Sequence, residues 1–414
     1  MRIFKSLILF LLIITIFTSS SYNFVSRNVD KTINVITDIY SKVESYALSK
    51  SNVTEITYEI YNVTDPQFDS SYKCLNSKQK ELYKLLFSIS QKMPNGFIKL
   101  HKKYDDINKD VAIAYNALLY DRTEIFWMPY TYILSDYRFD NKVYTAIAFN
   151  YEGKNGSTNY NIPLSKRESM QKKFDEVVDK IVLNSKKFKS EYEIEKFFND
   201  YICENTEYVT EGELLSTAYG ALVYGQAHCE GYSRAFKHLC NKVEIECDLV
   251  CGESFNEGHM WNMVNIDGKH SFVDVTWNDR SDYKTYLYFN ITGKQVSFDH
   301  KLSPLFKNLS DEEIMVGSYN FVDNEATYTG NSYYVKSNFT IPLAYEGKIA
   351  PKIKEQFEKG NTYTELLFTS KKALSEFKNN ELGFIKKIQS GLKNIIIDSY
   401  LFERDVLVLF YKKA

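Results

Sequence analysis

The most informative stretch of the chain runs from Tyr219 to Asp279 and reads YGALVYGQAHCEGYSRAFKHLCNKVEIECDLVCGESFNEGHMWNMVNIDGKHSFVDVTWND. Cys229 precedes a helical pattern, His259 opens an expected strand, and Asp274 lies on the following strand. A thiol, an imidazole and a carboxylate in this order can act as a nucleophile, a base and the group that orients the base. The spacing of these residues within local structure decides whether they can meet.

Cys229 is expected at or just before the N-terminus of a helix. Four apolar residues after it recur at helical spacing: Tyr232, Phe236, Leu239 and Val243. Such a period predicts one buried helix face. The free N–H groups and the dipole at a helix N-terminus favour an anion, which lowers the pKa of a thiol placed there.

The next segment predicts a β-hairpin. Its strands are His259–Ile266 and Lys269–Thr276, joined by the two-residue turn Asp267-Gly268. If Ile266 faces Lys269, Asp274 lies opposite Trp261 and diagonal to His259 on the same face. Diagonal neighbours are ~7–8 Å apart at Cα, so a carboxylate can reach an imidazole. The register therefore predicts a His259–Asp274 pair.

Two other histidines compete with His259 as the base. The same register places His270 opposite Asn265, too far along the strand to reach Asp274. His228 adjoins the thiol, but consecutive side chains rarely point at the same spot, so His259 is preferred. Taken singly, a Cys is usually buried filler and a His or Asp usually a surface or capping residue, and that reading stays open for each alone.

Composition limits the classes of function. The chain has 414 residues, enough for two or three domains. Hydrophobic residues make up 44% and charged residues 25%, as in an ordinary globular protein. The formal net charge is −2, so no strong field draws nucleic acid or an anionic membrane. We therefore expect no nucleic-acid partner.

The N-terminus has the order of a secretory signal peptide. Basic residues occur in Met1–Lys5, an apolar run covers Ser6–Thr18, and small serines follow. The run is shorter than the ~20 residues that span a bilayer, although an uncleaved anchor remains an alternative. We expect residues 1–21 to direct a secreted or cell-surface protein, with membrane contact only if this segment is retained.

The rest of the chain predicts an α+β protein in three parts. These are an N-terminal α+β region at 22–184, a core at 185–305 and a small C-terminal α+β module at 316–414. Aromatic and β-branched runs predict a strand at Tyr286–Ile291 and short strands at 318–335. A helical period predicts one helix over 371–388.

The six cysteines do not form a metal motif. They are Cys74, Cys203, Cys229, Cys240, Cys247 and Cys251. There is no CxxC pair, and no calcium loop of the D-x-[DN]-x-[DN]-G kind is present. We therefore expect neither a metal nor a cofactor. If Cys229 stays reduced, the remaining five cannot all pair in disulfides.

Three segments resemble the motifs of the transglutaminase-like superfamily: GQAHCEGYSRAF, GHMWNMVNIDGK and FVDVTWND. They occur in order, and YLYFNITGKQVSFDH after them is similar to the bacterial-type secreted members. The resemblance covers about 185–300 strongly and 75–185 weakly. It implies a papain-like fold in which a Cys-bearing helix packs on an antiparallel sheet.

The resemblance also implies roles for individual residues. It makes Cys229, His259 and Asp274 a papain-like catalytic triad of nucleophile, base and orienting group. It makes the Cys229 backbone N–H one oxyanion donor, with a second expected from Gln226 or Tyr224. The candidate cleft wall is Trp261. One departure is His228, where related sequences usually carry a small apolar residue, and no role is expected for it.

These expectations describe an exported cysteine enzyme that acts on peptide or other amide bonds through an acyl-thioester at Cys229. As a hydrolase it would be a cysteine protease or amidase, and as an acyltransferase it would be of the transglutaminase type. The expected substrate is a protein, a peptide or a cell-wall amide. The alternative from another class is a non-catalytic cell-surface binding or scaffold module on the same fold.

Overall fold

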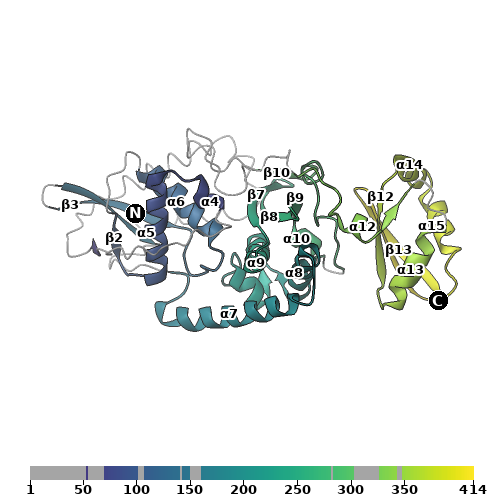
Figure 1. Ribbon diagram of the computed structural model, residues 1–414, viewed down its shortest axis with the longest axis horizontal. Helices are drawn as coiled ribbons and strands as arrows, with labels where there is room; N and C mark the ends of the chain where they lie inside the picture. Colours follow the sequence, from purple (N-terminus) through teal and green to yellow (C-terminus); the bar gives the residue numbers. More distant parts are fainter. Residues whose placement is uncertain are drawn as a thin grey trace, which may run out of the picture.

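The computed structural model describes residues 53–54, 70–100, 107–139, 142–149, 160–280, 283–302, 326–342 and 347–414. The expected signal segment at 1–21 lies outside these residues. Across the described ranges, none of the helices combines the length and apolarity needed to cross a membrane. Figure 1 shows an N-terminal part, a central part and a C-terminal part in a row.

The N-terminal part combines helices with a mixed sheet. Its helices are α4 (Ser70–Cys74), α5 (Ser77–Lys92) and α6 (Ile107–Asp121). Its strands are β1 (Val53–Thr54), β2 (Phe97–Lys99), β3 (Tyr132–Phe139) and β4 (Lys142–Phe149), in the order β1-β2-β4-β3. A capping box between Asn76 and Gln79 starts α5, and Met93 in the left-handed conformation ends it. The apolar faces of α5 and α6 are buried against each other.

Two helices lead into the central part. The long helix α7 (Leu164–Ser185) runs from below the N-terminal part to below the central one (Figure 1). Next comes α8 (Glu191–Asn205), which begins with a capping box between Ser190 and Glu193. On α8, residues such as Phe198 and Ile202 are fully buried, as the helical period predicts.

The central part is built on an antiparallel four-stranded sheet. Its strands are β7 (Cys247–Ser254), β8 (Glu257–Ile266), β9 (Lys269–Val273) and β10 (His300–Leu302), in the order β10-β7-β8-β9. Against this sheet packs α9 (Cys229–Lys242), as the resemblance implies. Tyr232, Phe236 and Leu239 of α9 are fully buried. This Cys-bearing helix on an antiparallel sheet is the papain-like core arrangement.

The predicted hairpin register is confirmed. Ile266 pairs with Lys269 and Asn262 with Val273. Asp267 and Gly268 have φ values of 52° and 75°, the two left-handed residues of a type I′ turn. The predicted extent of the second strand is wrong, because β9 ends at Val273.

Asp274 ends the strand because it starts a short helix. Its Oδ1 accepts a hydrogen bond from the Trp277 N–H at 3.1 Å, which caps α10 (Val275–Asn278). Aspartate commonly caps helices in this way. The carboxylate is therefore fixed at a strand–helix junction.

The predicted strand at Tyr286–Ile291 is also wrong, because this segment forms turns with one isolated bridge from Ile291 to Phe272. The Tyr288 N–H donates to the Asn278 side chain at 3.0 Å, and Asn290 is left-handed with φ 55°. A side-chain acceptor and a left-handed residue replace the ladder that a strand requires. The segment then leads through α11 (Gly293–Val296) to β10.

The C-terminal part is a separate α+β module with its own apolar core. Its strands are β11 (Thr340–Ile341), β12 (Tyr363–Phe368), β13 (Ile395–Glu403) and β14 (Val406–Lys413), in the order β11-β12-β14-β13. Its helices are α12 (Tyr333–Lys336), α13 (Ile349–Glu358), α14 (Lys371–Asn379) and α15 (Glu381–Gln389).

Two sequence predictions for this module are wrong. The predicted helix over 371–388 is broken at Asn380, whose side chain accepts a hydrogen bond from the Gly383 N–H and so caps α15. In place of the short strands predicted at 318–335, residues 326–335 contain turns and the start of α12, while residues 318–325 lie outside the described part of the chain. Tyr334 is buried there, so its aromatic character reflects packing rather than a strand.

Candidate active site

Cys229 is the first residue of α9, and His228 is its N-cap. The start of this helix is fixed by Gly231, where a Cβ would lie only 2.3 Å from the Leu215 carbonyl oxygen and 2.7 Å from Ala227 Cβ. Only glycine permits so close an approach. The helix is also tied to β8, because the Ser233 hydroxyl donates to the Met260 carbonyl at 2.9 Å.

His259 lies on β8 and faces both Asp274 and Cys229. Its Nε2–H donates to Asp274 Oδ2 at 2.7 Å. The ring also interacts with the Cys229 thiol, which contributes to the raised pKa of His259. Because Nε2 is held by the carboxylate, Nδ1 is the nitrogen that remains for the sulfur. The structure thus brings together the three residues that the hairpin register and the resemblance selected.

The charges at these three residues reinforce one another. Burial raises the pKa of Cys229, but hydrogen bonds with His228 and His259 and their charges outweigh it and lower the value to about 6. Burial lowers the pKa of His259, yet the Asp274 charge and hydrogen bond raise it to about 10. Burial opposes the ionised Asp274, but His259 and then His300 hold its pKa well below the ordinary value. Near neutral pH the favoured state is therefore a thiolate–imidazolium pair.

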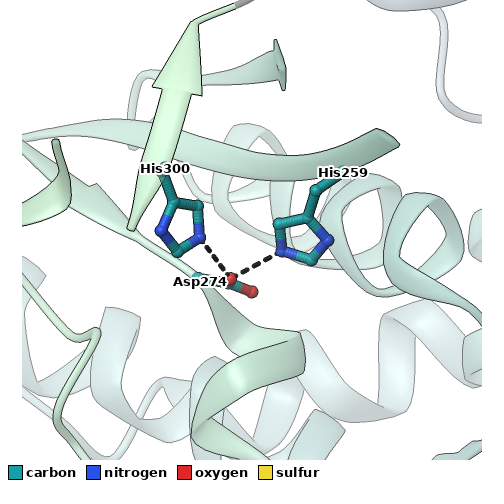
Figure 2. Close-up of side chains that lie close together, drawn as sticks. All are labelled: His259, Asp274 and His300. Carbon is teal, nitrogen blue, oxygen red and sulfur yellow. Dashed lines mark hydrogen bonds and ion pairs between the residues drawn. The ribbon is translucent and has the colours of Figure 1, made fainter. Parts of the chain in front are cut away.

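A further histidine, His300, shares the Asp274 carboxylate. Its Nε2 lies 3.0 Å from the same Oδ2 that His259 binds, and its Nδ1 lies 2.6 Å from Asp299 Oδ1. Figure 2 shows the two imidazoles on either side of Asp274, each joined to the same oxygen. The His300 side chain is 0% exposed.

Sequence reasoning assigned no role to His300. The available signal was the Asp299-His300 pair at the end of the YLYFNITGKQVSFDH stretch. No local period connects this pair to Asp274. The connection depends on β10 pairing with β7, where His300 faces Ser254, and that contact joins distant parts of the chain.

His259, Asp274 and His300 also offer ligand atoms within 4.8 Å of one another, as a metal site would. Ligand atoms around a tetrahedral ion with bonds of about 2.0–2.1 Å lie about 3.3 Å apart. Here the imidazole nitrogens lie 2.7 and 3.0 Å from the carboxylate oxygen, which are hydrogen-bond distances. The donor set therefore fits a hydrogen-bonded network better than an ion.

His228 is the N-cap of α9 and directly precedes Cys229 in the chain. Its Nε2 is 3.1 Å from Ser216 Oγ. Burial lowers the pKa of His228, but its hydrogen bond with Cys229 and the thiolate charge raise it overall. The expectation that His228 has no role therefore conflicts with its electrostatic coupling to the Cys229 thiol.

The residues expected around the cleft take different positions. Trp261 is fully buried, with its ring stacked on His259 at 5.9 Å between centroids, so it supports the site from inside. Gln226, on β6 (Gln226–Ala227), is exposed. Tyr224 is 45% exposed at the end of the π-helical turn η2 (Gly220–Tyr224).

Tyr208 is an additional aromatic residue near the thiol, and the sequence did not single it out. It lies on β5 (Glu207–Tyr208), which pairs with β6, and is 50% exposed. Burial raises its pKa, and so do the negative charges of Cys229, Glu257 and Asp274. Its phenol group is therefore placed close enough to the sulfur for electrostatic contact.

A stacked aromatic pair, Phe255 and Trp277, borders the His259 side of the site. Phe255 is 72% exposed and stacks on Trp277, with centroids 5.2 Å apart and planes within 10°. The Trp277 ring in turn lies 5.7 Å from the His259 ring. Phe255 and Asn256 form the β7–β8 turn with φ values of 49° and 66°. A phenylalanine in the left-handed region is strained, which is a common feature of functional sites.

Comparison with known proteins points to one family for the central part. Residues 178–277 match the family model of the transglutaminase-like superfamily. No curated protein matches the chain.

Three similar solved structures share 13–16% sequence identity with this chain. A structure described as a TGase, with no organism stated, has a TM-score of 0.24 over 44% of this chain and 52% of its own. A proposed cysteine protease from Cytophaga hutchinsonii has a TM-score of 0.23, and the match covers 35% of this chain and 64% of that protein. A proposed protease from Parabacteroides distasonis has a TM-score of 0.20, and the match covers 34% of this chain and 35% of that protein. The chain thus spans less than two thirds of each of these proteins.

Proposed function

We propose that this protein is a cysteine enzyme that acts on amide bonds through an acyl-thioester at Cys229, because residues 178–277 match the family model of the transglutaminase-like superfamily. The observation that carries the proposal is the 2.7 Å bond from His259 Nε2 to Asp274 Oδ2, on an imidazole that also interacts with the Cys229 thiol. This is the arrangement in which a base is oriented by a third group and activates a nucleophile.

The first half of the reaction forms the acyl-enzyme. The Cys229 thiolate attacks the amide carbonyl carbon, and the carbonyl electrons move to the oxygen. The backbone N–H of Cys229, at the start of α9, faces that oxygen as one oxyanion donor. The tetrahedral intermediate then collapses, the C–N bond breaks, and His259 gives its Nδ1 proton to the leaving amine.

The second half releases the acyl group. His259, now neutral, takes a proton from water or from an incoming amine, which attacks the thioester carbonyl. The C–S bond breaks, and the thiolate and imidazolium are restored. Water gives hydrolysis and an amine gives acyl transfer, so the acceptor alone separates a protease or amidase from a transglutaminase-type enzyme.

The environment of the substrate follows from the expected signal segment. If residues 1–21 direct export, the amide belongs to a protein, a peptide or the cell wall outside the cytoplasm. The Phe255–Trp277 pair lies on the side of His259. Since the leaving amine and the acceptor both exchange a proton with His259, we propose that this pair contacts the amine side of the substrate.

The proposal is tested by the pH dependence of thiol alkylation. Iodoacetamide should label Cys229 rapidly at pH 6.5–7, because its pKa is lowered to about 6. A Cys229→Ala variant should lose this labelling and all turnover of a peptide and amine substrate panel. Full activity in Cys229→Ala would show that the enzyme proposal is wrong.

The matched control is Cys203→Ala. Burial holds the pKa of the Cys203 thiol well above its usual value, so this variant should keep wild-type labelling at pH 6.5. A binding or scaffold module would have no need of an activated thiol. If Cys229 reacts no faster than Cys203 at that pH, the non-catalytic alternative is favoured.

A further inference from the structure

His300 is enclosed by two carboxylates, one at each ring nitrogen. Nε2 lies 3.0 Å from Asp274 Oδ2, and Nδ1 lies 2.6 Å from Asp299 Oδ1. An ionised carboxylate can only accept hydrogen bonds, so each of these nitrogens must carry a proton. An imidazole with protons on both nitrogens is a cation.

Both carboxylates are held in the ionised form. For each, burial raises the pKa, but hydrogen bonds and positive charges outweigh it and leave the value below the usual one. Asp299 also accepts a hydrogen bond from the Tyr288 hydroxyl at 2.8 Å. Its Oδ2 lies 3.8 Å from Nε of Arg404.

The charged groups alternate in sign from the module to the sulfur. In order they are Arg404, Asp299, His300, Asp274, His259 and Cys229. The rings of Trp261, Trp277 and Tyr288 enclose His300 on its remaining sides. Buried charges are tolerated when each has a partner of opposite sign and its hydrogen bonds are made, as they are here.

Arg404 comes from the C-terminal module, at the turn between β13 and β14. Its guanidinium lies 5.0 Å from the Tyr288 ring centre and 5.2 Å from that of Phe298, and it donates to the Gln295 carbonyl. Through Arg404, the module therefore contacts the segment that leads into His300.

We propose that His300 is a permanent imidazolium that positions Asp274 for His259, and that the C-terminal module fixes this cation through Arg404 and Asp299. With Oδ1 held by the Trp277 N–H and Oδ2 held by two imidazoles, the Asp274 carboxylate cannot rotate. The positive charge of His300 also disfavours a second cation at His259, which keeps the His259 proton transferable. His300 is thus a positioning residue, and the C-terminal module belongs to the catalytic unit.

The functional half of this inference rests on the proposed cysteine chemistry, but the charge of His300 does not. It is measured directly by nitrogen NMR of the histidine rings in the full chain, with His300 assigned by comparison with His300→Gln. Two protonated nitrogens at pH 7.5 are expected, in line with the raised pKa that Asp274 and Asp299 give His300 against burial. A neutral tautomer at that pH overturns the inference, whatever the enzyme acts on.

Asp299→Asn separates charge from shape. The amide can still hydrogen-bond Nδ1, but the lost negative charge lowers the pKa of His300. We expect the pKa of His300 to fall and the low-pH limb of iodoacetamide labelling to move upward by about half a pH unit, because the thiolate loses a nearby cation as His300 becomes neutral. An unchanged labelling profile while His300 is neutral overturns its coupling to the thiol.

Arg404→Gln tests the contribution of the module, and Arg280→Gln is its matched control. Arg280 binds Glu403 with both contacts at 3.0 Å, so it makes a neighbouring link between the core and the same turn without touching Asp299. Arg404→Gln should lower kcat severalfold with KM little changed, and Arg280→Gln should leave both within twofold. If the two variants have equal effects, Arg404 only docks the module, and its proposed role in fixing His300 through Asp299 is overturned. If the wild type turns over no amide substrate, the rates at which iodoacetamide labels Cys229 at pH 6.5 are compared between the two variants in place of kcat.

Discussion

At the scale of single residues, the site depends on a carboxylate that serves two imidazoles. Asp274 accepts three hydrogen bonds, and each comes from a different element. His259 can hold its proton near neutral pH because this carboxylate raises its pKa against burial. We therefore expect the reactivity of Cys229 to depend on Asp274 through His259.

The first residue-scale prediction is a bell-shaped pH profile. With the pKa of Cys229 at about 6 and that of His259 at about 10, kcat/KM should rise through the first value and fall through the second. Asp274→Asn removes the charge that raises the pKa of His259, so the basic limb should move down toward the ordinary value of about 6.5. A steady-state profile over pH 5–11 measures both limbs.

The stability of the folded chain should follow the same pair. The raised pKa of His259 means that its contribution is complete below the unfolded value of about 6.5 and disappears as the pH rises through about 10. The lowered pKa of Cys229 acts in the opposite direction, because its contribution grows as the pH rises from about 6 to the unfolded value of about 8.5. In Cys229→Ala this opposing contribution is absent, so urea unfolding of that variant should show a loss on the order of 3 kcal/mol between pH 6.5 and 10. Adding His259→Gln to the same variant is the control, and an equal loss in the two proteins would contradict the assignment.

At the scale of elements, the β7–β8 turn carries a side chain that suits binding better than folding. Type I′ turns favour Asn or Gly at both central positions, whereas Phe255 occupies the first here. A left-handed conformation costs an ordinary residue about 1–2 kcal/mol. The strained conformation of the turn keeps the exposed Phe255 ring stacked on Trp277.

Phe255→Asn should therefore separate stability from substrate binding. The free energy of unfolding should stay level or rise by about 0.5–1 kcal/mol, because the turn strain is relieved as the stack is lost. KM should rise severalfold with a smaller change in kcat. Leu382→Asn is the control, because Leu382 is 66% exposed on α15 of the C-terminal module. An unchanged KM in Phe255→Asn would show that the Phe255–Trp277 pair does not contact the substrate.

At the scale of the whole molecule, a buried carboxylate joins the C-terminal module to the core. Glu365 on β12 accepts hydrogen bonds from the Thr285 hydroxyl and, at 3.0 Å, from the Tyr286 N–H. Burial raises its pKa to about 7 despite these bonds. The segment it holds is the one that leads to His300.

The raised pKa of Glu365 predicts that docking of the module weakens at higher pH. Its contribution is complete below the unfolded value of about 4.5 and is lost as the pH rises through about 7. Hydrogen exchange at residues 283–300 should therefore be faster at pH 8 than at pH 6, after correction for intrinsic rates. Glu365→Gln should remove this difference, and equal differences in both proteins would show that another group is responsible.

The sequence alone determined the local features of this protein. The helical period after Cys229 gave α9, and Asp267-Gly268 gave a turn whose register selected His259 over His270. These signals work because helix periods and two-residue turns are set by neighbours in the chain. The three motifs then pointed to the superfamily that residues 178–277 match.

Only the tertiary structure decided how these features meet. It ended β9 at Val273, replaced the expected strand at Tyr286–Ile291 with turns, and brought His300 to Asp274 through the pairing of β10 with β7. It also placed Arg404 of the C-terminal module on Asp299. The physical reason is that a buried charge needs a partner of opposite sign, and only the packed chain determines which residue is near enough to be that partner. The periods of two residues in a strand and 3.6 residues in a helix reflect neighbours in the chain, so they do not predict contacts between residues a hundred positions apart.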